Sequence, residues 1–156
     1  MTTPPPSAGI LLWRRGTAGL EVLLAHPGGP YWRSRDQGAW QLPKGRIEAG
    51  ETAEEAALRE AHEELGAALS GELVPLGSVR QAGGKQVEAF ALEGSFDPQM
   101  LAGNRFPLEW PPRSGQIEYF PEVDAVRWFS LAEADAMMLP SQRPFLNRLA
   151  ALAAAA

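Results

Sequence analysis

The part of this sequence that most constrains its fold and chemistry runs from Gly45 to Ala67 and reads GRIEAGETAEEAALREAHEELGA. Near its end, Glu60, Glu63 and Glu64 stand at positions i, i+3 and i+4, so a helix places their carboxylates on one face. Like charges at this spacing repel one another and destabilise a bare helix. Divalent cations such as Mg²⁺ offset such repulsion, because they bind carboxylates together with substrate phosphates. The alternative is a solvated acidic surface, the usual meaning of a glutamate-rich helix face.

The same stretch carries start and stop signals for a helix. Thr52 followed three residues later by Glu55 is a capping-box pattern, and Gly66 suits the left-handed residue that ends a helix. The residues with the spacing of a buried stripe are small or aliphatic: Ala57, Leu58, Ala61 and Leu65. We therefore expect one face of this helix to pack on a sheet while the glutamates project from another.

The spacing of the polar and glycine positions resembles a known motif. Five residues separate Gly45 from Glu51, seven separate Glu51 from Arg59, and the sequence then continues R-E-A-H-E-E-L-G-A. This resembles the Nudix box, which reads G, five residues, E, seven residues, R-E-apolar-x-E-E-x-G-apolar. Ala61 and Ala67 depart mildly, because the family usually has a larger aliphatic residue there. The resemblance implies a Nudix-type α/β/α sandwich with a mixed β-sheet, and a single Nudix domain spanning residues 1–156.

Composition narrows the function further. The chain has 156 residues, which suits one domain with its own core. It has no cysteine and only two histidines, which excludes disulfides and thiolate sites and argues against a histidine-rich zinc site. A net charge of −5 argues against binding to duplex nucleic acid. The first residues lack a signal-peptide pattern and no apolar run reaches the ~20 residues of a membrane span, so we expect a cytoplasmic enzyme that binds no membrane.

The remaining elements follow from periodicity and turn residues. We expect strands at residues 8–15, 20–27, 39–43, 72–81, 85–94 and 125–130, and helices at 131–138 and about 143–153. Residues 1–7 read as a flexible lead-in. Residues 28–38 read as a binding loop. The long, proline-containing segment 95–124 reads as a lid or binding loop, because structureless connections of this length are uncommon in compact domains.

The resemblance assigns roles to the residues of the box. Glu60, Glu63 and Glu64 become ligands of Mg²⁺, or of Mn²⁺, with a backbone carbonyl of Gly45 or Lys44 as a further ligand. Since the family hydrolyses nucleoside diphosphates linked to another group X, these ions act on a phosphoanhydride.

Two other residues of the box have a simpler alternative role. Arg59 is expected to orient a glutamate through charge-assisted hydrogen bonds, and its alternative is a surface ion pair with Glu55. Glu51 is expected to support the loop before the helix, and its alternative is a favourable interaction with the helix dipole.

Other site residues come from outside the box. Lys44, Arg33 and Arg35 are candidates to contact phosphates. The aromatic candidates for stacking on a base, of which Tyr31 and Trp40 are the first choices, are Tyr31, Trp32, Trp40, Phe106, Trp110, Tyr119 and Phe120. Many Nudix enzymes add a carboxylate from a distant loop as a base or ligand, and Glu118 and Glu122 are the candidates. Glu122 is favoured because of its position before the strand that contains Trp128.

Two functions from different classes remain. The segment RDQGAWQLPKGRIEAGE is similar to the lead-in of Nudix enzymes that act on nucleoside triphosphates or dinucleoside polyphosphates, including a bacterial branch of predicted NTP pyrophosphohydrolases. The alternative is a Nudix-fold module that senses or binds a nucleotide without hydrolysing it. The intact set Glu60, Glu63 and Glu64 favours the enzyme, because a degenerate module would be expected to lose one of them. We expect a monomer or a homodimer.

Overall fold

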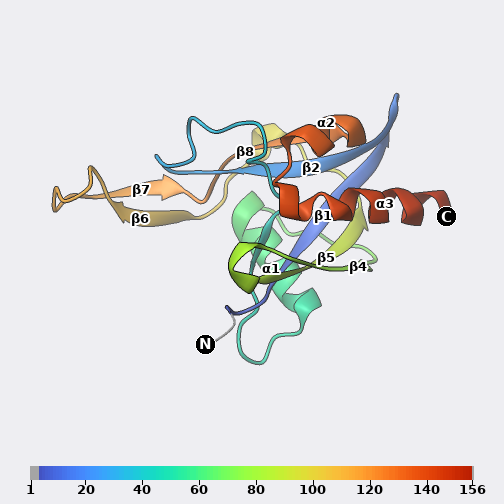
Figure 1. Cartoon of the computed structure of the whole chain (residues 1–156), viewed down its shortest axis with the longest axis horizontal. Helices are drawn as coiled ribbons and strands as arrows, with labels where there is room; N and C mark the ends of the chain where they lie inside the picture. The colour runs from blue at the N-terminus through green and yellow to red at the C-terminus, as the bar shows by residue number, and fades with distance from the viewer. Residues whose placement is uncertain (1–3, 156) are drawn as a thin grey trace.

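The computed structural model describes residues 4–155 and has a central β-sheet with helices on both sides (Figure 1). The strands are β1 (Ser7–Gly16), β2 (Gly19–Pro27), β3 (Lys44–Arg46), β4 (Val74–Arg80), β5 (Gln86–Glu93), β6 (Arg105–Glu109), β7 (Ile117–Pro121) and β8 (Val123–Ser130). The α-helices are α1 (Ala53–Leu65), α2 (Leu131–Met137) and α3 (Pro144–Ala155), and short 3-10 turns lie at Ala82–Gly84, Pro98–Met100 and Pro140–Gln142.

The sheet is mixed, with strand order β4-β5-β1-β2-β8 and β3 added to β1. The pair β1–β5 is parallel, and all the other neighbours are antiparallel. Side chains alternate along β1, so Ile10 and Leu12 join the core under α1 while Leu11 and Trp13 join the core under α2 and α3. Burial on both faces gives the expected α/β/α sandwich with a mixed sheet.

Helix α1 begins and ends where its signals predict. Thr52 and Glu55 form a complete capping box, and Gly66 caps the other end at φ 80°. The four buried residues are Ala56, Ala57, Ala61 and Leu65, so Ala56 lies deeper than Leu58, which is only partly buried. Three of these are alanines, which let the helix lie close to β1.

The segment before the helix differs from expectation. Residues 39–43 do not form a strand: they make only two isolated bridges, from Gln41 to Ala25 and from Trp40 to Met138. The strand is β3, which starts after Pro43 and pairs with the beginning of β1. Ser7, expected in the flexible lead-in, is the first residue of β1 and is fully buried, whereas residues 1–3 lie outside the described part.

The segment 95–124 is a second departure. It is not a structureless lid: β6 and β7 form an antiparallel hairpin that projects from the body (Figure 1). We call residues 105–121 the arm. Its second strand runs directly into β8, so Glu122 lies at the junction of arm and sheet. Over residues 4–155, no helix is long and apolar enough to cross a membrane.

Candidate active site

Arg59 is the centre of a network of carboxylates on α1 and on the loop before it. One edge of the guanidinium binds both oxygens of Glu51, with Nε donating to Oε2 at 2.6 Å and Nη2 to Oε1 at 2.9 Å. Nη1 donates to Glu60 Oε1 at 2.8 Å and to Glu63 Oε2 at 3.3 Å, and Nη2 also donates to the carbonyl of Arg46 at 2.9 Å. Arg59 therefore joins helix, loop and β3, rather than pairing with Glu55, which is engaged in the capping box.

This network sets the charge of its members. Hydrogen bonding to Arg59, followed by the backbone N–H of Glu48, lowers the pKa of Glu51 to about 2. The same hydrogen bond raises the pKa of Arg59. Glu51 therefore holds the loop that precedes the helix, as expected of a bidentate arginine–carboxylate pair.

Gly45 lies against the carboxylate of Glu60. A Cβ built on Gly45 overlaps the Glu60 carboxyl group, so only glycine leaves room for it. Glu60 is largely buried, with its side chain 14% exposed, and burial raises its pKa although Arg59 opposes the shift. The glycine at the start of the box thus determines where this carboxylate can sit.

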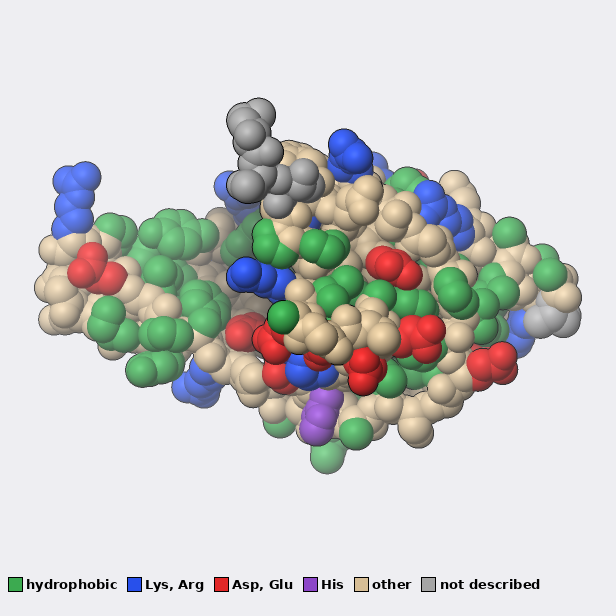
Figure 2. Space-filling view, turned by 90° about the horizontal axis from the view of Figure 1, so that it is seen from below, with side chains coloured by type: hydrophobic (Ala, Val, Ile, Leu, Met, Phe, Trp, Pro, Cys, Tyr) green, Lys and Arg blue, Asp and Glu red, His purple; other side chains and the backbone are tan. Residues whose placement is uncertain are grey.

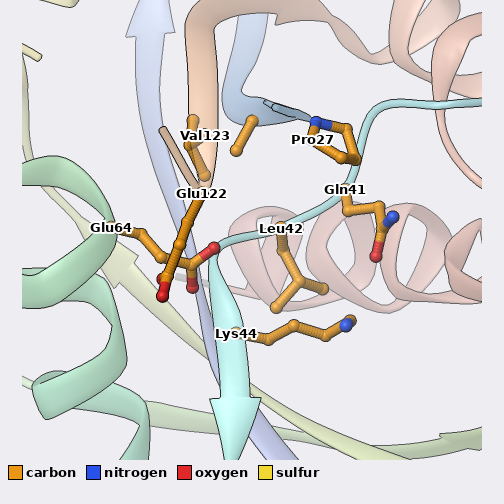
Figure 3. A pocket seen from close by; sticks show the side chains of 8 residues that line it. Pro27, Gln41, Leu42, Lys44, Glu64, Glu122 and Val123 are labelled. Atoms are coloured by element: carbon orange, nitrogen blue, oxygen red, sulfur yellow. The ribbon is translucent and has the colours of Figure 1, made fainter. Parts of the chain in front are cut away.

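Beside the network lies a hollow of about 150 Å³ at the root of the arm. It is lined by Ala25, Pro27, Gln41, Leu42, Lys44, Glu64, Glu122 and Val123. Figure 3 shows that the side chains of Glu64, from α1, and Glu122, from the junction with β8, lie next to each other. The side chains of Gln41 and Lys44 extend on the other side of the hollow.

Glu64 is the least compensated carboxyl group of the cluster. Its Oε2 is buried and has no hydrogen-bond partner among the described residues. Burial, reinforced by the charges of Glu60 and Glu122 and opposed by Lys44, raises the pKa of Glu64 to about 8. An orphaned buried oxygen of this kind calls for an explanation such as a bound ion.

Lys44 and Glu122 complete the charged lining. Burial, followed by repulsion from Lys85, lowers the pKa of Lys44, while Glu64 and Glu60 oppose the shift. Partial burial raises the pKa of Glu122, and Glu60 and Glu63 add to the effect. Glu118, the competing candidate, stands on the arm opposite Leu108 and does not line the hollow.

The candidates for base and phosphate recognition are divided between two places. Tyr31 is 59% exposed and meets the ring of Trp110 edge to face at 5.5 Å, with Arg33 6.0 Å from the same ring. Arg33 also lines a second hollow of about 260 Å³, together with Gly29, Phe120, Pro121 and Asp124. Arg35 lies over Trp32 and does not line either hollow.

Trp40 lies elsewhere. It is 5% exposed, packs on Phe129 and His26, and donates its Nε1–H to Asp36. The structure therefore places Trp40 in the core and does not bring it to the hollow that Gln41, its neighbour in sequence, lines.

Two residues near the site are not among those predicted from the sequence. Gln41 lines the hollow, and the ring of His26 lies between Asp124 and the carbonyl of Arg35. For Gln41 the available signal is its position in the WQLPKG run just before the box. For His26 no signal exists in the sequence, because Asp124 is 98 residues away.

The ligand atoms of the glutamate cluster are of the type that a hard divalent cation binds, but their positions in the structure do not form a complete binding site. The candidate side-chain ligands are all carboxylates, and Glu64, whose Oε2 has no hydrogen-bond partner among the described residues, lines the hollow together with Glu122. Figure 2 shows acidic side chains gathered on one face beside basic ones, near the arm, whose visible surface is largely hydrophobic. Among residues 4–155 no group of three His, Asp or Glu side chains is arranged to hold a metal ion. The carboxylates of Glu60 and Glu63 instead accept hydrogen bonds from Arg59.

A family model described as "NUDIX domain" matches residues 3–149. The chain is 31% identical over 157 residues to an RNA pyrophosphohydrolase of Rhodospirillum rubrum, covering 95% of this chain and 91% of that protein.

Two solved structures share the fold. One is a binary complex of a C. elegans Ap4A hydrolase, with TM-score 0.67, 20% identity, and coverage of 96% of this chain and 99% of that one. The other is the NUDIX domain of Shewanella oneidensis NrtR complexed with ADP ribose, with TM-score 0.65, 18% identity, and coverage of 98% and 90%.

Proposed function

The chain belongs to the Nudix hydrolase family and is a pyrophosphohydrolase acting on acid anhydrides, and from that premise we propose that it cleaves the phosphoanhydride of a nucleoside triphosphate or dinucleoside polyphosphate. The observation that carries this proposal is the buried, unpartnered Oε2 of Glu64, a residue that lines a small hollow beside Glu122. We also propose that residues 1–156 form one Nudix domain.

The proposed metal ligands are Glu60, Glu63 and Glu64, with the backbone carbonyl of Gly45 or Lys44 as a further oxygen donor. Nudix proteins typically depend on a divalent metal, and Mg²⁺ or Mn²⁺ suits this all-oxygen set. When bound, the ion supplies positive charge to the phosphoryl oxygens of the substrate and favours deprotonation of the attacking water.

The protein's own residues position the reaction. Arg59 keeps the carboxylates of Glu60 and Glu63 directed to the same side of α1. Glu122 accepts the proton of the attacking water, a role that suits a carboxyl group whose pKa is raised. Lys44 donates to a phosphate oxygen from the other side of the hollow. Phosphoryl transfer requires mainly such positioning and electrostatic stabilisation, and no protein nucleophile.

The rest of the substrate would extend toward the arm. Tyr31, at the edge of the Trp110 ring, presents an exposed aromatic surface for a base, and Arg33 lies beside it. Arg35, the third basic candidate, lies on the same loop and would contact an outer phosphate. A substrate with a nucleoside at some distance from the cleaved bond agrees with the names of two relatives, an RNA pyrophosphohydrolase and an Ap4A hydrolase.

A nucleotide-sensing module is the second candidate. It is favoured by the similarity to a NUDIX domain in complex with ADP ribose. The two candidates differ in turnover, because a sensor binds its nucleotide without consuming it.

The test is a product analysis over nucleoside triphosphates, dinucleoside polyphosphates, ADP ribose and 5′-triphosphorylated RNA, each with Mg²⁺. We expect a nucleoside monophosphate, pyrophosphate or phosphate as products. Glu63→Gln or Glu64→Gln lowers turnover at least ~100-fold, because a metal ligand is lost. Glu122→Gln lowers it about 100-fold, as for loss of a general base.

Glu118→Gln is the matched control, since Glu118 is an exposed carboxylate on the arm, and we expect its activity to stay within about twofold of the wild type. Near wild-type turnover by both Glu63→Gln and Glu64→Gln, with thermal unfolding unchanged, contradicts the proposed site. Tight nucleotide binding by the wild type without any product supports the sensing module instead.

A further inference from the structure

We propose that Gln41 binds the polyphosphate chain through its side-chain NH₂, and that the buried Gln142 is a positioning residue that fixes this orientation. The proposal rests on the proposed function, because it names a further substrate contact in the same hollow. Gln41 lines the hollow beside Lys44, whereas Gln142 belongs to the 3-10 turn Pro140–Gln142 in front of α3.

The side-chain amide of Gln142 has one orientation that its contacts allow. Its side chain is fully buried, and the backbone N–H of Leu42 donates to its Oε1 at 3.1 Å. A backbone N–H can only donate, so this contact requires the oxygen of the Gln142 amide at that position. The Nε2 of Gln142 is thereby fixed on the opposite side of the amide.

The orientation of the Gln142 amide in turn fixes that of the Gln41 amide through a hydrogen bond. Nε2 of Gln142 donates to Oε1 of Gln41 at 3.3 Å. If the Gln41 amide turned over, two NH₂ groups would face each other, which is repulsive. The backbone of Gln41 cannot compensate by shifting, because it exchanges two hydrogen bonds with Ala25, at 2.7 and 2.9 Å.

Gln41, a residue that lines the hollow, therefore has its acceptor engaged and keeps only its NH₂ donors for a ligand. Its Oε1 is turned to Gln142, and within residues 4–155 no hydrogen bond engages its NH₂. Figure 3 places Gln41 and Lys44 on the side of the hollow away from Glu64 and Glu122. The hollow therefore has an acidic side and a donor side, and an anionic oxygen at the donor side is the ligand that satisfies both Gln41 and Lys44.

Gln142→Glu tests this orientation. The introduced carboxylate still accepts from Leu42 but cannot donate to Gln41, so the Gln41 amide turns and directs its oxygen at the substrate. At alkaline pH, where the introduced carboxyl is ionised, we expect KM to rise about tenfold, the size of one hydrogen bond to a charged group, with kcat within about twofold. Gln142→Met removes the donor without adding charge and should raise KM by about threefold.

Gln41→Ala completes a double-mutant cycle. It should raise KM about as much as Gln142→Glu does, and combining the two should add nothing, because Gln142 acts only through Gln41. The matched control is Gln86→Glu, which adds the same charge at an exposed position on β5 and should leave KM unchanged. The dissociation constant of inorganic pyrophosphate with Mg²⁺ gives a second measurement that needs no turnover.

The outcomes separate the two proposals. Wild-type turnover with an unchanged KM in Gln142→Glu and Gln142→Met overturns the role of Gln142. A KM increase in the double variant equal to the product of the two single increases also overturns it. A wild type that releases no product overturns the proposed function, and the affinity of the wild type and of each of these variants for pyrophosphate then decides the role of Gln41 and Gln142.

Discussion

The glutamate cluster has two sides that differ in how their charge is compensated. On the side around Arg59, which we call the paired side, Glu51 and Glu60 each accept from the guanidinium at 2.9 Å or less. On the open side, Glu64 has a buried oxygen without a partner, and its neighbour Glu122 also has a raised pKa. The paired side is complete without any ligand, whereas the open side is not.

This difference shows that repulsion among the helix glutamates is not by itself the reason for a cation to bind. Repulsion among Glu60, Glu63 and Glu64 is a reason to expect a cation, but Arg59 already compensates two of the three. The charge penalty that remains is concentrated at Glu64, where burial disfavours ionisation. The paired side therefore determines the geometry of the site, and the open side supplies the reason for a ligand to bind.

Among variants that keep every glutamate of the cluster, the largest effect is expected from displacing a carboxylate of the paired side. In Gly45→Ala, the added methyl group takes the place of the Glu60 carboxyl, which must leave its contact with Arg59. We expect turnover to fall about 100-fold, as for a misplacement of about 1 Å in a catalytic site. Steady-state kinetics with the substrate identified by product analysis measures the loss.

Gly94→Ala is the control for this variant, because its Cβ would approach only Leu12 Cδ1, at 3.3 Å, and lies outside the box. It should keep its activity within about twofold. Full activity in Gly45→Ala would show that the position of Glu60 in the structure is not the one used in the reaction.

A smaller effect is expected from Arg59→Lys, which keeps the charge but loses the fork that holds both oxygens of Glu51. Turnover should fall about tenfold, because Glu60 and Glu63 lose a fixed partner. The pKa of Glu51 lies at about 2 in the folded protein, below its ordinary value of 4.5, so its stabilising contribution is present above pH 4.5 and is lost as pH falls toward 2.

Arg59→Lys should therefore lower the free energy of unfolding most above pH 4.5, and the difference from the wild type should shrink on acidification. Urea unfolding at a series of pH values measures it. Arg14→Lys, which alters the pair of Arg14 with Glu21 and the contact of Arg14 with the Trp128 ring, is the control for a change of arginine to lysine that leaves Glu51 untouched. Equal losses at every pH would mean that Glu51 is not the partner that matters.

Features that depend on residues close together in the sequence were predicted well. Capping, the buried stripe and the shared face of the glutamates all depend on spacing within about one helix, so α1 was predicted almost residue by residue. The single exception, Ala56 in place of Leu58, reflects the close approach of the helix to β1. Hairpins β1–β2 and β4–β5 also follow from local alternation and turn residues.

Features that depend on distant partners were not predictable in this way. The arm at 105–121 contains prolines at the ends and within its strands, which made the segment read as a loop. Trp40 is a candidate for stacking on a base in the sequence, and only its contacts with Phe129 and Met138, about 90 to 100 residues later, place it in the core. The contact of Gln41 with Gln142 spans 101 residues and leaves no local signal.

The smallest effect, and the sharpest test of the open side, is the stability of Glu64→Gln in the presence of a chelator. The pKa of Glu64 is about 8 in the folded protein and near its ordinary 4.5 when unfolded, so between these values the folded state binds the extra proton. Wild-type stability should therefore fall as pH rises from about 4.5 to about 8, a slope opposite in sign to that caused by Glu51.

Glutamine carries no such proton, so Glu64→Gln should match the wild type below pH 4.5 and exceed its melting temperature by a few degrees above pH 8, although it is inactive. Parallel melting curves at all pH values would contradict the burial of an uncompensated carboxylate. Adding Mg²⁺ should then stabilise the wild type more than the variant at high pH, because binding offsets a penalty that only the wild type carries.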